Sequence, residues 1–129
     1  MLCFINLDIG DKYDTNIFKS ISILLYKEEF VADYPVVLVV SMQAKPGVED
    51  EMREAIVKIA DASRAEDGCE IYQLLQDSVT PEKFLLVERW RDKSAFKAHQ
   101  ESPHLAEGFA VLENLQAHSP VFASWRAIN

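Results

Sequence analysis

The sequence has few cysteines and few glycines, and each scarcity excludes a class of site. Its two cysteines, Cys3 and Cys69, lie far apart and form no C-x-x-C pair, which argues against a zinc knuckle, a dithiol redox site and a disulfide scaffold. Its four glycines are scattered, so neither a P-loop nor a G-x-G-x-x-G motif is present, and G-x-S-x-G is missing as well. We therefore expect reduced thiols and no phosphate or dinucleotide site.

Positive charge and long apolar runs are scarce too. The chain has 13 Lys and Arg against 21 Asp and Glu, a net charge of −8, and it lacks the basic cluster that a nucleic-acid backbone requires. Its apolar stretches fall far short of the roughly 20 residues that span a bilayer, and no basic segment precedes an apolar run at the N-terminus. These features predict a cytoplasmic protein that binds neither nucleic acid nor membranes.

The composition that remains is that of one globular domain, with 129 residues of which 49% are hydrophobic and 26% charged. The first 35 residues differ from the rest. Residues 16–31 suit an amphipathic helix with Ile17 and Ile21 on one face, although Ile21–Tyr26 suits a short strand equally well. Because proline and the residue before it resist helix continuation, Pro35 marks a boundary. We expect an N-terminal extension at 1–35 and a folded domain at 36–129.

Apolar patterning in the domain predicts a fixed order of elements. Val36–Gln43 is β-branched and apolar on both parities, as in a strand buried on two faces. A helix follows the Pro46-Gly47 turn and should end at Gly68. Cys69–Asp77 and Lys83–Arg91 alternate as an antiparallel hairpin around a short turn.

Two helical segments and a strand complete the domain. Asp92 or Ser94 can cap a short helix, and Pro103 can open its continuation. The segment Val121–Ile128 is predicted to form the last strand. The resulting strand, helix, hairpin, helix, strand order predicts an α+β, ferredoxin-like β-α-β-β-α-β fold, with an antiparallel sheet and its helices on one face.

The second face of that sheet needs a cover. Val37 and Val39 lie on the opposite parity to Val36, Leu38 and Val40, so the face without helices would leave apolar surface in water. Twofold pairing is the commonest oligomer. We therefore expect a homodimer formed through this face.

Glu88 is the anomalous residue of the hairpin. It shares a strand face with Phe84, Leu86 and Trp90, and a carboxylate in such surroundings must be paired, hydrogen-bonded or raised in pKa. Perturbed groups of this kind are enriched at functional sites. The alternative is a structural Glu88 that bonds a neighbouring helix or pairs with an arginine.

Two histidines are candidates for acid–base chemistry. His99 and His104 are five residues apart, and either imidazole can act as a general base near neutral pH. Metal pairs on a helix favour a separation of four, so this spacing argues against zinc or iron ligation. A helix-end or core position is the structural alternative for His99, and His118 is expected to be exposed. Tyr72 and Trp90 suit either a pocket wall or the core.

Several of these residues fall into a connected set of motifs, namely Pro46-Gly47, Gly68-Cys69-x-x-Tyr72, Pro81-x-x-Phe84-x-x-x-Glu88-x-Trp90, Ala95-x-x-x-His99 and Ser102-Pro103-His104-Leu105. In this order and spacing they closely resemble the antibiotic biosynthesis monooxygenase superfamily, and most closely its bacterial quinol-monooxygenase branch. The resemblance runs from Val36 to about Trp125.

This resemblance implies a dimeric α+β barrel, with a small-molecule pocket in each subunit between sheet and helices. For monooxygenase members it implies oxidation of a small aromatic quinol or phenol by dioxygen without flavin, haem or metal. It makes His99 the base or hydrogen-bond partner of the phenolic oxygen and Glu88 its orienter, with pocket residues Tyr72, Phe84, Trp90 and His104. We expect no cofactor and no metal ligand.

The superfamily also includes enzymes of other classes, so two alternatives remain open. One is an isomerase or related proton-transfer enzyme that acts on a small hydroxylated carbonyl signal molecule through the same histidine and carboxylate. The other is a non-catalytic ligand-binding dimer. Oxygen consumption distinguishes the monooxygenase from both.

Overall fold

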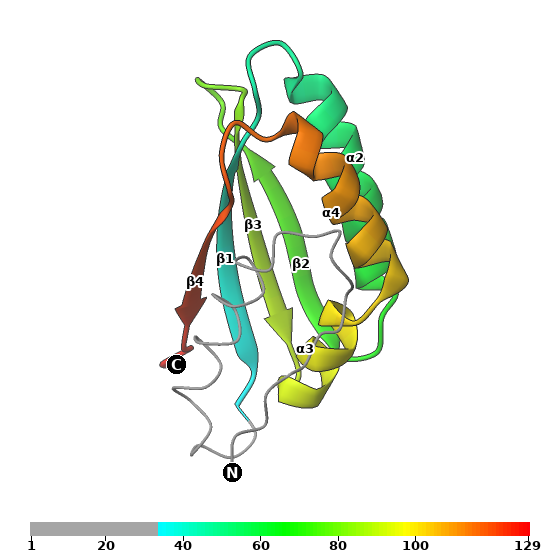
Figure 1. Ribbon diagram of the computed structural model, residues 1–129. Helices are drawn as coiled ribbons and strands as arrows, with labels where there is room; N and C mark the ends of the chain where they lie inside the picture. The colour runs from blue at the N-terminus through cyan, green and yellow to red at the C-terminus, as the bar shows by residue number, and fades with distance from the viewer. Residues whose placement is uncertain (1–33) are drawn as a thin grey trace.

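The computed structural model describes residues 34–129 of the chain. Four antiparallel strands form one sheet in the order β2-β3-β1-β4, with bounds β1 (Val36–Gln43), β2 (Cys69–Gln76), β3 (Lys83–Trp90) and β4 (Val121–Trp125). Helices α2 (Glu49–Arg64), α3 (Lys93–Gln100) and α4 (Pro103–Leu115) all cover the same face of this sheet (Figure 1). The expected α+β ferredoxin-like fold is confirmed. The helix or strand expected within 16–31 lies outside the described residues.

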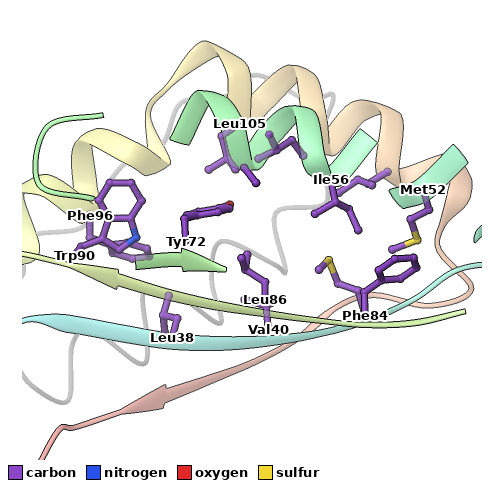
Figure 2. Packing of buried hydrophobic residues seen from close by; sticks show 14 of the residues in the cluster. Leu38, Val40, Met52, Ile56, Tyr72, Phe84, Leu86, Trp90, Phe96 and Leu105 are labelled. Carbon is purple, nitrogen blue, oxygen red and sulfur yellow. The ribbon is translucent and has the colours of Figure 1, made fainter. Parts of the chain in front are cut away.

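The core lies between the sheet and its helices. In β1 the even-numbered side chains from Val36 to Met42 are at most 6% exposed, whereas the odd-numbered ones are more accessible. Figure 2 shows Leu38, Val40 and Leu86 on the sheet beneath Ile56 and Leu105 of the helices. The strand periodicity of two therefore directs one set of residues into the core and the other to the open face.

The helices begin at the expected signals. The Asp92 side chain accepts a hydrogen bond from the Ala95 amide at 2.8 Å and caps α3, and Pro103 occupies the first turn of α4. Leu105, Leu112 and Leu115 form the buried stripe of α4.

Four boundaries differ from expectation. Strands β2 and β3 each end one residue before the expected Asp77 and Arg91. Helix α2 ends at Arg64 and not at Gly68, because residues 65–68 form a separate turn in which Gly68 adopts φ +84° just before β2. Strand β4 ends at Trp125 and not at Ile128, which is 95% exposed. Residues beyond Trp125 do not continue β4 although Ile128 is apolar, because β1 pairs with β4 only from Val37 to Ser41.

Strand β2 contains a bulge that the alternating pattern does not reveal. Cys69 pairs with Trp90, Ile71 with Arg89 and Tyr72 with Glu88, so the register shifts between Cys69 and Ile71. The extra residue in a bulge changes the sheet face to which the following side chains point. Tyr72 is thereby placed beside Glu88 on the face that the helices cover.

The opposite face of the sheet is largely apolar. Its central side chains include Val37, Val39 and Val87, and towards its edges Ile71, Leu75, Val121 and Trp125 are between 43% and 60% exposed. No helix within residues 34–129 is long and apolar enough to cross a membrane.

Candidate functional site

Four polar side chains gather where the end of β3 meets the two short helices. Glu88 comes from β3, His99 from the end of α3, His104 from the first turn of α4, and Glu66 from the turn between α2 and β2. The side chains of Glu88 and His99 are 5% and 3% exposed, those of Glu66 and His104 17% and 27%. The cluster is therefore closed on the sheet side and meets solvent at Glu66 and His104.

Both imidazoles bind one carboxylate oxygen. Glu66 Oε1 lies 2.7 Å from His99 Nδ1 and 2.8 Å from His104 Nε2. Two histidines five residues apart do not share one face of a continuous helix, but α3 ends at Gln100 and α4 starts at Pro103. Because the chain turns between them, two histidines five residues apart reach the same atom. Ser102 secures this turn by donating its hydroxyl to the His99 carbonyl at 2.6 Å.

Glu88 lies on the other side of His99. The indole Nε1 of Trp90 donates to Glu88 Oε2 at 3.0 Å, and His99 Nε2 is 3.6 Å from the same oxygen. Burial raises the pKa of Glu88 to about 7, with a smaller contribution from the negative charge of Glu66 and with the Trp90 hydrogen bond acting in the opposite direction. The neighbouring Arg89 pairs with Glu70, so the expected arginine alternative for Glu88 is not observed among the described residues.

His99 is held as a neutral imidazole. Burial lowers its pKa below the ordinary 6.5, although the hydrogen bond and charge of Glu66 partly oppose that effect. A neutral ring has one N–H and one lone pair. The carboxylate of Glu66 is the better acceptor for the proton on Nδ1, which leaves the lone pair on Nε2, directed towards Glu88. The proton assignment follows from these hydrogen-bond partners.

Aromatic rings close the cluster. Trp90 stacks on His99 with ring centroids 4.3 Å apart and planes inclined by 26°, and Tyr72 meets His99 edge-on at 5.7 Å. Burial, with help from Glu88, raises the pKa of the Tyr72 phenol well above its ordinary range. Ser63 lies beside His104, because its hydroxyl donates to the Ile59 carbonyl at 2.8 Å and lies 3.3 Å from His104 Nε2.

The structure thus brings together five of the six residues expected at the site: Tyr72, Glu88, Trp90, His99 and His104. Phe84 is not among them. It lies on the same face of β3 but four residues from Glu88, which is roughly 13 Å along a strand, and it packs near Met52 (Figure 2). A hollow of about 440 Å³ at that end of the sheet is lined by Phe84, Leu75 and the exposed His118, and not by the cluster.

Glu66 is the member that the sequence did not reveal. It stands in a turn between Ala65 and Asp67, where no apolar periodicity marks it as part of a buried face, and its partner His99 is 33 residues away. Only the tertiary fold joins them.

Comparison of the sequence with known proteins identifies a matching family. Residues 35–111 match the sequence profile described as antibiotic biosynthesis monooxygenase. The Bacillus subtilis protein YcnE, named "Putative monooxygenase", is 31% identical over 76 residues, 59% of this chain and 79% of that protein. An uncharacterized Synechocystis protein is 30% identical over 93 residues, 72% of this chain and 63% of its own length, so the match spans less than two thirds of that relative.

Solved structures agree on the fold. A crystal structure from Pseudomonas aeruginosa has a TM-score of 0.69 at 27% identity and covers 74% of this chain and 95% of that one. A Mycobacterium tuberculosis structure also has a TM-score of 0.69, at 24% identity, and covers 74% and 97%. At that identity it supports the fold alone.

Proposed function

Since the chain belongs to the antibiotic biosynthesis monooxygenase family, we propose that it is a cofactor-independent monooxygenase that oxidises a small aromatic quinol or phenol with dioxygen. The observation that carries the proposal is the buried, neutral imidazole of His99. Its Nδ1 is bound to Glu66 and its Nε2 lone pair faces the interior. The monooxygenase name of the Bacillus subtilis relative supports the reaction class.

In this proposal His99 Nε2 removes the phenolic proton. Glu66, whose carboxylate accepts a hydrogen bond from Nδ1–H at 2.7 Å, stabilises the imidazolium that forms and keeps the ring oriented. The phenolate then donates an electron to dioxygen, and the resulting radicals combine at a ring carbon. One oxygen atom stays bonded to the ring carbon and the other is released as water. The substrate supplies all four electrons, so no external reductant is needed.

Glu88 and the aromatic rings have supporting roles. Glu88, hydrogen-bonded by Trp90, is proposed to orient the substrate hydroxyl next to Nε2, and Tyr72 and Trp90 form the wall. A closed, apolar chamber strengthens electrostatic control of the phenolate. As whole residues, Glu88, Trp90 and His99 are at most 4% exposed. We therefore propose that α3 and α4, the helices that carry the imidazoles, move to open the site. His104 is the most accessible of the four polar members, and we propose that it lies at the entrance.

A proton-transfer enzyme is the second candidate, and one observation favours it. Glu88, with a pKa of about 7, and His99, with a lowered pKa, lie 3.6 Å apart. A buried carboxyl group and a neutral imidazole this close together can move a proton between adjacent atoms of a hydroxylated carbonyl compound. Such an isomerase would exchange substrate protons with solvent in the absence of oxygen.

The assembly is also part of the proposal. We propose a cytoplasmic homodimer in which the open face of the sheet, with Ile71, Leu75 and Trp125 at its accessible edges, packs on its twofold mate. The free thiol of Cys69 suits a reducing compartment. The family match begins at residue 35, which supports the proposed division into an extension at 1–35 and a domain at 36–129.

The experiment is oxygen uptake by chelator-treated protein with a panel of quinols and phenols. At least one substrate should be oxidised, and His99→Gln should lower the rate by roughly 10²–10⁴-fold, because general bases contribute on that order. The matched control is His118→Gln, which changes an exposed histidine outside the cluster and should keep the wild-type rate.

Equal rates for His99→Gln and the wild type would rule out the base role. A panel without any oxygen uptake, together with oxygen-independent proton exchange on a hydroxylated carbonyl compound, would favour the isomerase instead.

A further inference from the structure

Three ligand-type atoms of the cluster converge on one point. Glu66, His99 and His104 each offer one atom, a carboxylate oxygen or an imidazole nitrogen, and these atoms all lie within 4.8 Å of one another. We propose that they form a binding site for a divalent transition-metal ion of the zinc and iron(II) class. Two imidazoles and one carboxylate are the donor set that this class of ion favours.

The distances fit an ion after small side-chain movements. Metal–ligand bonds of about 2.0–2.2 Å separate neighbouring donors by roughly 3.4 Å in a tetrahedral site. Glu66 Oε1 is now 2.7 and 2.8 Å from the two imidazole nitrogens, because hydrogen atoms occupy the contacts. An ion that replaces those hydrogens needs these separations to widen by roughly 0.6 Å, which side-chain rotation supplies.

The surroundings match those of protein metal sites. A ligating histidine usually donates its other ring N–H to a carboxylate, which fixes the ring and raises its basicity. With an ion on His99 Nδ1, the proton moves to Nε2, which already lies 3.6 Å from Glu88 Oε2. Glu88 is itself held by Trp90. Such a carboxylate–histidine–metal arrangement needs no residue beyond those already in place.

The site is also open on one side. His99 is closed off by protein, but His104 and Glu66 reach solvent, so the ion has an entry path. Ser63 Oγ and Ser102 Oγ lie 3.3 and 3.4 Å from His104 Nε2, where they can hydrogen-bond water that completes the coordination. Three protein ligands with positions left for water is the arrangement of an accessible site.

Metal binding has a consequence for the proposed reaction, and this consequence alone rests on the proposed function. A neutral imidazole has one lone pair. An ion on Nδ1 puts the proton on Nε2 and removes the lone pair that would accept the phenolic proton. The bound ion should therefore inhibit quinol oxidation in proportion to occupancy.

Titration of the full, untagged, chelator-treated chain with Zn²⁺ and Co²⁺ tests the site. We expect one ion per chain by calorimetry and visible absorption from Co²⁺ in a nitrogen and oxygen environment. Glu66→Gln and His104→Phe should each weaken binding by at least 10-fold. The controls Glu70→Gln and His118→Phe change exposed residues of the same types and should bind as the wild type does.

Unfolding curves without metal show whether each variant is folded, and His104→Phe alters a partly exposed ring, so it should fold. Absence of one-to-one binding by the wild type, or unchanged affinity in both site variants, would overturn the proposal. Oxygen uptake by chelator-treated protein is measured separately, so failure of the metal site is distinguishable from failure of the monooxygenase.

Discussion

At the residue scale, Glu88 is a buried carboxyl group whose charged form the core disfavours. It is fully enclosed by the sheet and the helices, and its one short hydrogen bond comes from the Trp90 indole. Burial disfavours the charged carboxylate more than this bond stabilises it, so its pKa is about 7. Near neutral pH the folded protein therefore carries a mixture of charged and neutral Glu88.

This raised pKa predicts that Glu88 makes stability depend on pH. The folded-state pKa of about 7 exceeds the ordinary 4.5, so the folded chain holds the proton more tightly than the unfolded chain. The stabilisation is complete below about pH 4.5 and is lost as pH rises through 7. Between pH 5 and 8 the free energy of unfolding should fall in the wild type relative to Glu88→Gln by on the order of 3 kcal/mol.

Denaturant unfolding at fixed protein concentration measures the difference. His99 contributes a pH dependence of opposite sign, because its pKa is lowered. Its Nε2 lies 3.6 Å from Glu88 Oε2, so the difference between the two proteins measures the Glu88 carboxyl together with its effect on His99. His118→Gln, the exposed control, should follow the wild type. Parallel pH profiles for wild type and Glu88→Gln would contradict the prediction.

At the element scale, two short connections build the cluster. The turn at 65–68 carries Glu66, and the break between α3 and α4 separates His99 from His104. The first connection depends on Gly68, which has φ +84° and lies against α3, so that an added Cβ would collide with the Ala95 side chain. Neither a continuous α2 nor a continuous α3–α4 helix would join the three groups.

Gly68→Ala should therefore destabilise the protein by roughly 2–4 kcal/mol. About 1–2 kcal/mol comes from the left-handed backbone conformation, and the rest from the clash that pushes α3 away. Gly47→Ala is the matched control, because Gly47 has φ +85° and an added Cβ would meet nothing within 4 Å. Gly47→Ala should lose only the stability of about 1–2 kcal/mol that comes from the left-handed backbone conformation.

Thermal or denaturant unfolding of the two variants gives the comparison. Equal losses would show that the contact between Gly68 and α3 adds nothing to the backbone effect.

At the scale of the whole molecule, the two faces of the sheet are unequal. One packs on three helices, and the other presents Val39 and Val87 as a directly paired couple at its centre, with accessible apolar residues towards the edges. Burying apolar surface contributes about 25 cal/mol per Å². This face is therefore the surface through which we propose that two copies associate.

A charge at the centre of that face should prevent association. Val87→Lys is expected to shift the protein from dimer to monomer, since a lysine there would be desolvated without a partner. Val57→Lys is the control, because Val57 is 41% exposed on α2, on the helical side. Sedimentation or light scattering over a range of concentrations measures the mass, and a monomeric wild type would contradict the prediction.

The sequence by itself determined the order of elements, the ferredoxin-like fold and the family, because these depend on local periodicity and on motifs that span few residues. It also identified Glu88 as anomalous and His99 as a candidate, since a carboxylate on an apolar strand face is visible in the pattern.

Only the tertiary structure decided how these residues meet. It ended α2 early, brought His99 and His104 to one carboxylate oxygen, placed Tyr72 through a β-bulge and moved Phe84 out of the group. It also added Glu66, which is 33 residues from His99 and has no local signal. Periodicity describes which face a residue occupies, whereas contacts between distant segments depend on turns and packing that no local pattern encodes.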